Sequence, residues 1–146
     1  MGRSFSIDDI NSFLRKELGA WIGKRSLGED TDLFGELGVD GDDCGEFLQA
    51  FAQRFDVDMA GFLWFFHHGE EGYSPFSWIF PPPDRRVGRI PVTPGLLLAS
   101  ANAGKWAVDY PAYSLPKRRY DMIASWALLG LILCLVAIGL IYKLLQ

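Results

Sequence analysis

The chain has 146 residues, of which 49% are hydrophobic, and its formal net charge is −4. This length fits one domain of ordinary size with an appendage. The two cysteines, Cys44 and Cys134, lie in an amphipathic stretch and in a lipid-like run, which argues against a disulfide framework and fits a reducing compartment. Charged side chains interrupt the first apolar stretch, so a signal peptide is not expected, and the sequence has neither a P-loop nor a dinucleotide glycine fingerprint.

The first predicted element is a helix over residues 7–22. Ser6 is placed to cap its N-terminus, and apolar side chains recur at helical spacing until Gly23 ends the pattern. The loop that follows, residues 24–41, is long. Its leucines and its phenylalanine are placed to pin it to a core, so we expect an ordered loop.

A second helix is predicted from about Asp42 to Phe55, within an acidic stretch that spans residues 29–58. Ten acidic residues and one arginine give this stretch a net charge of −9, so the rest of the chain carries +5. One face of the helix is apolar, with Cys44, Phe47, Leu48, Phe51 and Phe55. The other face is polar, with Asp42, Asp43, Glu46, Gln49 and Gln53. We expect the apolar face to be buried and the polar face to be exposed.

This stretch resembles the acyl carrier proteins, whose loop and second helix have the form D-x-x-L/F-x-x-L-G-x-D-S-L-D-x-x-E-x-x-x-x-(L/F)-E-x-x-F. The residues in step with that form are Leu33, Leu37, Gly38, Asp40, Asp43, Glu46, Phe51, Phe55 and Asp56. Gly41 stands where the family has the serine that bears 4′-phosphopantetheine, and Asp42 replaces the leucine after it. By this Asp-Gly-Asp-Asp form, the chain resembles a bacterial family of acyl-carrier-like proteins of unknown function.

The resemblance implies a mainly α fold, with an acyl-carrier-like helical domain over residues 1–110. It also implies that the phosphopantetheine arm is absent, and we expect no other cofactor. The match covers about thirty residues and extends more weakly to the region around Trp106. A long loop before the second helix is normal in carrier proteins, which explains residues 24–41.

The middle of the chain changes character. Residues 62–66 form a dense aromatic run of strand-like composition, and Val87 and Ile90 belong to a second candidate strand. These two segments predict a small β-hairpin inserted into the helical domain, with Pro81–Pro83 as part of an extended spacer.

A short helix is then predicted from Leu96 to Ala103. Thr93 is a suitable N-cap, Pro94 suits the first helical position, and Gly104 ends the pattern. Residues 111–121 are expected to form a basic linker.

Residues 122–142 contain no charge over 21 positions, which as a helix would span about 31 Å, the thickness of a hydrocarbon core. Basic residues precede this span, so the positive-inside rule places the N-terminal domain in the cytoplasm and the single span in a bacterial inner membrane. With residues 143–146 as a short tail, we expect tail anchoring. A stripe of small residues on one face would permit self-association through the membrane: Ala127, Gly130, Cys134 and Ala137.

Two clusters contain possible metal ligands, and neither predicts a site. His67 and His68 lie beside Glu70 and Glu71, but adjacent histidines on a strand point to opposite faces and rarely share one ion. Calcium at the Asp-Gly-Asp-Asp sequence would lack the ligand ladder of an EF-hand. We also reject Cys44 as a substitute attachment point, because it shares the apolar helix face.

The remaining basic cluster is Arg85, Arg86 and Arg89, which is too short to predict nucleic-acid binding. We therefore expect a membrane-anchored, non-catalytic interaction module that docks a basic protein partner. The expected partner-binding residues are Asp40, Asp42, Asp43 and Glu46. The alternative is a small membrane-proximal enzyme that uses His67, His68 and the acidic region.

Overall fold

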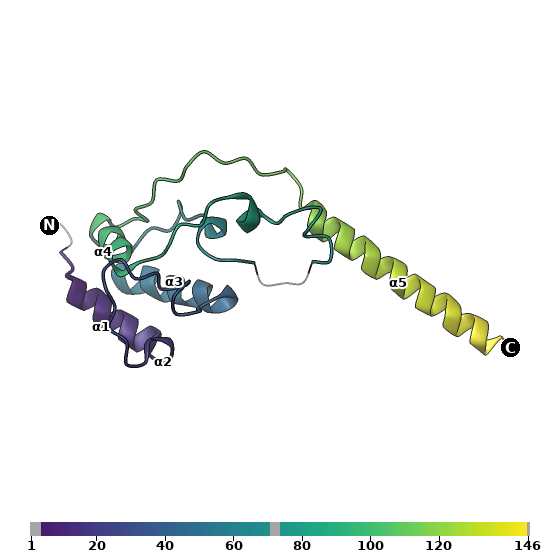
Figure 1. Cartoon of the computed structure of the whole chain (residues 1–146), viewed down its shortest axis with the longest axis horizontal. Coiled ribbons are helices and arrows are strands. Elements are labelled where there is room, and N and C mark those ends of the chain that lie inside the picture. Colours follow the sequence, from purple (N-terminus) through teal and green to yellow (C-terminus); the bar gives the residue numbers. More distant parts are fainter. Residues whose placement is uncertain (1–3, 71–73, 146) are drawn as a thin grey trace.

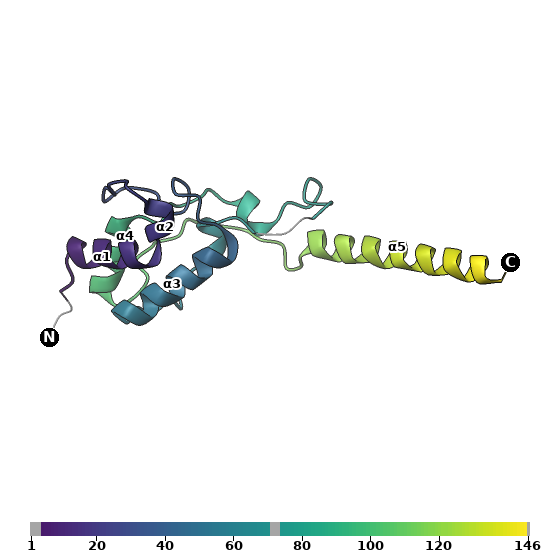
Figure 2. The same ribbon diagram turned by 90° about the horizontal axis from the view of Figure 1, so that it is seen from below.

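The computed structural model describes residues 4–70 and 74–145, and its regular structure is helical. Five α-helices are present in this part of the chain: α1 (Ile7–Glu17), α2 (Gly19–Ile22), α3 (Gly41–Phe55), α4 (Pro94–Ala103) and α5 (Tyr120–Leu144). Two 3-10 turns lie between them: η1 (Trp64–Phe66) and η2 (Pro83–Arg86). Helices α1 to α4 gather at one end of the molecule, and α5 extends away from them as a rod (Figures 1 and 2).

Helix α1 begins at a capping box. The Asp9 amide donates to the Ser6 hydroxyl at 3.3 Å, and the Ser6 amide donates to the Asp9 carboxylate at 2.8 Å. The single predicted helix over residues 7–22 is wrong at Leu18, where the backbone leaves helical geometry and a short second helix follows. Gly19 weakens the helix there, while Leu18 stays buried in the core.

Helix α3 has the predicted faces. Its apolar residues are almost fully buried, and every residue of the predicted polar face is exposed. Asp40 caps its start, with the Gly41 amide donating to the Asp40 carboxylate at 3.1 Å. The helix ends at Asp56 in the left-handed conformation, with φ of 52°.

The core lies between α1, α3, α4 and the long loop. The ring of Phe13 in α1 contacts the rings of Phe47, Phe51 and Phe55 in α3, with centroids 5.4 to 6.1 Å apart. The loop is pinned as predicted, because Leu33 is fully buried and its amide donates to the Val92 carbonyl at 2.9 Å.

The predicted β-hairpin is wrong. The aromatic run contains η1, residues 87 to 90 have no regular structure, and one hydrogen bond of 2.6 Å joins the Ile90 amide to the Phe66 carbonyl. Phe65, Phe66 and His67 are all buried, although consecutive side chains of a strand would point to opposite faces. The aromatic composition therefore reflects packing inside the core rather than a strand.

Helices α4 and α5 begin close to their predicted starts. The Leu96 amide donates to the Thr93 hydroxyl at 3.1 Å, and α4 ends at Gly104 with φ of 68°. Helix α5 extends two residues beyond the predicted span at each end, and none of its most apolar window is buried. By length and composition, it is able to cross a membrane. Glu71 and Gln146, two residues of the predicted features, lie outside the described residues.

Candidate functional site

The four predicted partner-binding residues lie together at the start of α3. Asp40 caps the helix, and Asp42, Asp43 and Glu46 are exposed within its first two turns. Acidic side chains at this end are stabilised by the helix dipole. Within the described part of the chain, the carboxylates of Asp42, Asp43 and Glu46 form no ion pair and accept no side-chain hydrogen bond. Their charge is therefore open to solvent.

Gly41 begins α3 with a φ of 52°. This is the left-handed region, which glycine adopts freely and a residue with a side chain adopts at a cost. The position that the carrier resemblance assigns to a serine therefore has a backbone shape that suits glycine. The chain offers no hydroxyl group there.

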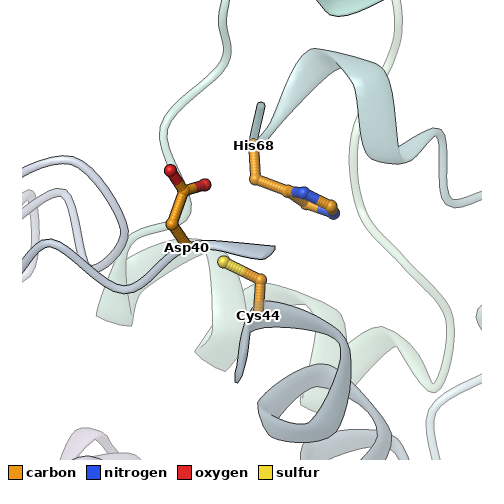
Figure 3. Close-up of side chains that lie close together, drawn as sticks. All are labelled: Asp40, Cys44 and His68. Atoms are coloured by element: carbon orange, nitrogen blue, oxygen red, sulfur yellow. The ribbon is translucent and has the colours of Figure 1, made fainter. Parts of the chain in front are cut away.

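A second cluster joins the start of α3 to the chain after η1. Figure 3 shows that the side chains of Asp40, Cys44 and His68 face a common space, and their ligand atoms all lie within 4.8 Å of one another. Cys44 is buried, His68 is half-buried and Asp40 is exposed. Sequence reasoning missed this group because His68 lies far along the chain from the other two residues.

This cluster contains the nitrogen, sulfur and oxygen donors that suit zinc. Donor atoms that share a zinc ion lie only about 3–4 Å apart, and the cysteine must be a thiolate. Here the Cys44 thiol donates to the Val39 carbonyl at 3.3 Å, and His68 Nδ1 lies 3.0 Å from the Gly69 carbonyl. The side chains would have to exchange these hydrogen bonds to hold an ion.

His67 lies in a different environment from His68. Trp106 and the Leu63 amide both donate to the Tyr110 hydroxyl, at 2.8 and 3.1 Å, which leaves that hydroxyl to donate to His67 Nε2 at 2.7 Å. His67 Nδ1 then donates to the Ile90 carbonyl at 2.9 Å. Burial lowers the pKa of His67 to about 4, so the ring is neutral. Both of its nitrogen atoms have structural partners.

Arg89 lies next to His67 and bonds to both its backbone and the long loop. Its guanidinium forms two hydrogen bonds to the Asp32 carboxylate, at 2.5 and 2.9 Å, and its Nε donates to the His67 carbonyl at 3.2 Å. Burial raises the pKa of Asp32, but the hydrogen bonds from Arg89 and the Gly35 amide outweigh this effect and the pKa is lowered. Arg89 thus ties the long loop to the chain after η1.

A third group lies where α5 meets the domain. The guanidinium of Arg119 donates to both oxygens of Glu70, at 3.2 and 2.6 Å, and to both oxygens of Asp121, at 3.0 and 2.6 Å. Beside it is a cavity of about 460 Å³ between α5 and the segment from Ser74 to Arg85. The small-residue stripe of α5 is exposed along its length.

The comparisons with known proteins identify a family. Residues 7–109 match the family described as "Protein of unknown function (DUF1493)", and the chain belongs to this family. No curated protein and no solved structure matches the chain. The matched region contains α1 to α4 and ends before α5. The acyl-carrier resemblance stays a prediction.

Proposed function

We propose that this member of the DUF1493 family is a membrane-anchored, non-catalytic module that docks a basic protein partner through the start of α3. The observation that carries the proposal is the exposure of α5: none of its apolar window is covered by the rest of the chain. A helix of this kind needs a lipid or protein environment. The domain attached to it carries Asp42, Asp43 and Glu46 exposed on its surface.

The orientation of the anchor is part of the proposal. Lys117 and Arg118 are exposed directly before α5, whereas Arg119 is neutralised by two carboxylates. Exposed basic residues beside a span favour the cytoplasmic side. We therefore place the helical domain in the cytoplasm and the span in a bacterial inner membrane.

The docking surface consists of Asp40, Asp42, Asp43 and Glu46. Several other acids bond to groups of the same chain: Asp9 caps α1, Asp32 pairs with Arg89, and Asp121 pairs with Arg119. The three carboxylates in the first two turns of α3 have no such partner among the described residues. An exposed field of one sign steers a partner of the opposite sign and weakens with salt.

The proposed module is acyl-carrier-like without carrier chemistry. The order of a capped helix α1, a long pinned loop and the acidic helix α3 supports this part of the proposal. The glycine at position 41 supports the absence of the phosphopantetheine arm.

Photo-crosslinking in cells tests the docking. A crosslinking residue in place of exposed Gln49 would capture the partner, and the triple variant Asp42→Lys, Asp43→Lys and Glu46→Lys would lose it. The matched control reverses three exposed acids elsewhere, Asp8, Asp30 and Asp109, and so makes the same change in net charge. We expect the control to retain capture at low salt, because its three substitutions lie outside the docking surface. Charges at an interface act mainly on the rate of association.

The same partners recovered equally from wild type and from the α3 triple variant would contradict docking. The acidic groups would then serve only to keep the domain soluble beside an anionic membrane. Circular dichroism of both triple variants checks that they are folded, which we expect because all six substituted side chains are exposed.

A further inference from the structure

The cavity beside α5 has one polar end and one apolar wall. Its polar lining includes Glu70, Asp84, Arg85 and Arg119, which lie at the domain end of α5. Its apolar wall comes from α5 itself, through Trp126, Leu128, Leu129 and Ile132. A ligand that fills this cavity must therefore combine a charged head with an apolar chain.

One carboxylate that lines the cavity, that of Asp84, has an unsatisfied oxygen. Asp84 Oδ1 is buried and accepts no hydrogen bond from any residue that the structure describes. A buried carboxylate oxygen without a donor is costly, so it calls for a missing partner. The other two acids of the wall, Glu70 and Asp121, are already satisfied by Arg119. Asp84 therefore requires a donor, and a cationic N–H group would fit best.

The neighbouring residue supplies the complementary charge. Arg85 is exposed, and its guanidinium makes one long hydrogen bond, 3.5 Å to the Ser77 hydroxyl. Most of its donors are therefore able to bind a phosphate. A carboxylate and a guanidinium side by side match a head group that contains both an ammonium and a phosphate.

The balance of charge favours such a zwitterion. Three acids and two arginines line the cavity, which gives the lining a net charge of −1. An anionic head group would add negative charge beside three carboxylates, whereas a zwitterion adds none. A quaternary ammonium has no N–H group for Asp84, but a primary ammonium has three.

The cavity also lies at the level where α5 would enter a bilayer. The Ser74 hydroxyl lies 3.1 Å from the Ser125 hydroxyl, and the rings of Phe80 and Tyr120 are 6.1 Å apart, so the segment runs beside the first turns of α5. Along this segment, Trp78 is 79% exposed and Ile79 is 47% exposed. Exposed aromatic and apolar side chains beside a span are typical of the membrane interface.

We propose that this cavity binds a phospholipid with a primary amine in its head group, of the phosphatidylethanolamine class. The ammonium donates to the Asp84 carboxylate where it lines the cavity, the phosphate accepts from Arg85, and one acyl chain lies along Leu129 and Ile132. This inference rests on the membrane anchorage of the proposed function and not on the docking through α3.

Native mass spectrometry of the full chain in detergent tests the site. The probes are phosphatidylethanolamine, phosphatidylcholine and phosphatidylglycerol with identical acyl chains. We expect roughly tenfold stronger retention of the ethanolamine lipid, the effect of one charge-assisted hydrogen bond. Asp84→Asn should remove the preference, and Arg85→Gln should weaken both zwitterionic lipids.

Arg86→Gln is the matched control, because Arg86 donates to the Pro81 carbonyl and does not line the cavity. Equal retention of the three lipids, or a preference that Asp84→Asn leaves intact, would overturn the site. A preference for phosphatidylglycerol would also overturn the site, since binding of an anionic lipid requires only a cationic side chain. Flotation of the full chain with liposomes separates the two failures: a chain that floats without lipid preference contradicts the site alone, and a chain that does not float contradicts the anchor as well.

Discussion

At the scale of single residues, His67 shows how burial determines the protonation state of a side chain. The ring is fully buried, and the Tyr110 hydroxyl donates to Nε2, which leaves the proton on Nδ1 for the Ile90 carbonyl to accept. Burial is the main reason that the pKa falls to about 4 from the ordinary value of 6.5. The unfolded chain therefore binds a proton between pH 6.5 and 4 that the folded chain does not bind.

We expect the free energy of unfolding to fall as the pH drops from 6.5 towards 4. A shift of this size corresponds to about 3 kcal/mol, all of which is present above pH 6.5. Urea unfolding of the full chain in detergent, followed by near-UV circular dichroism at several pH values, measures this loss. His67→Gln should flatten the dependence in this window, and His68→Gln, which retains His67, should preserve it. A His67→Gln variant with the wild-type slope would show that another group is responsible.

Gly41 gives a second prediction at this scale. A phosphopantetheinyl transferase needs a hydroxyl nucleophile, and residue 41 has no side chain. Intact mass after co-expression with a broad transferase should stay that of the unmodified chain. We expect Gly41→Ser to remain unmodified as well, and to lose on the order of 1 kcal/mol of stability because of the positive φ. An authentic acyl carrier protein is the positive control. The gain of a pantetheine arm on the wild-type chain would contradict the prediction.

At the scale of elements, local chemistry determines several of the helix ends, and those ends could be predicted. Ser6, Thr93 and Gly104 act where the sequence places them, because a cap bonds to residues only three or four positions away. The apolar face of α3 follows from periodicity alone. The aromatic run at 62–66 could not be read correctly, because its side chains bury against partners as distant as Tyr110 and Tyr113.

The candidate site could be predicted only in part, for the same reason. The acidic residues of α3 are neighbours in sequence, so their exposure follows from the helix. The approach of His68 to Cys44, of Arg89 to Asp32 and of Arg119 to Glu70 depends on how distant segments pack. Asp84 is similar, since its unsatisfied oxygen becomes visible only once the chain is folded.

The cap of α4 gives a prediction at this scale. Thr93→Ala removes the acceptor for the Leu96 amide and should lower the free energy of unfolding by about 1 kcal/mol. Thr93→Ser keeps the hydroxyl and should retain most of that stability. Denaturant midpoints of the three chains decide between these outcomes. If serine and alanine lose equally, the methyl group of Thr93 matters and the cap does not.

At the scale of the whole molecule, a helical domain and an apolar helix are joined by a segment without regular structure. Figures 1 and 2 show the helical domain at one end and α5 projecting from it. The buried hydrophobic core consists of residues up to Trp106, so the domain does not depend on α5 for its packing. Helix α5 in turn buries none of its apolar window in the domain. Each part should therefore keep its own behaviour when the two are separated.

Alkaline carbonate extraction of membranes tests this separation. The full chain should stay in the membrane pellet, whereas a chain that ends at Pro116 should appear in the supernatant with its helical circular dichroism intact. A third chain with Leu131→Lys and Leu135→Lys keeps the length of α5 but places two charges in the span, each of which costs about 2.5–3.5 kcal/mol to insert. We expect this chain to be extracted as well, because insertion depends on an uncharged span and not on the mere presence of the helix. A full chain that carbonate releases would contradict the anchor. A double-lysine chain that stays in the pellet would instead indicate that the domain or the segment around Trp78 holds the protein on the membrane.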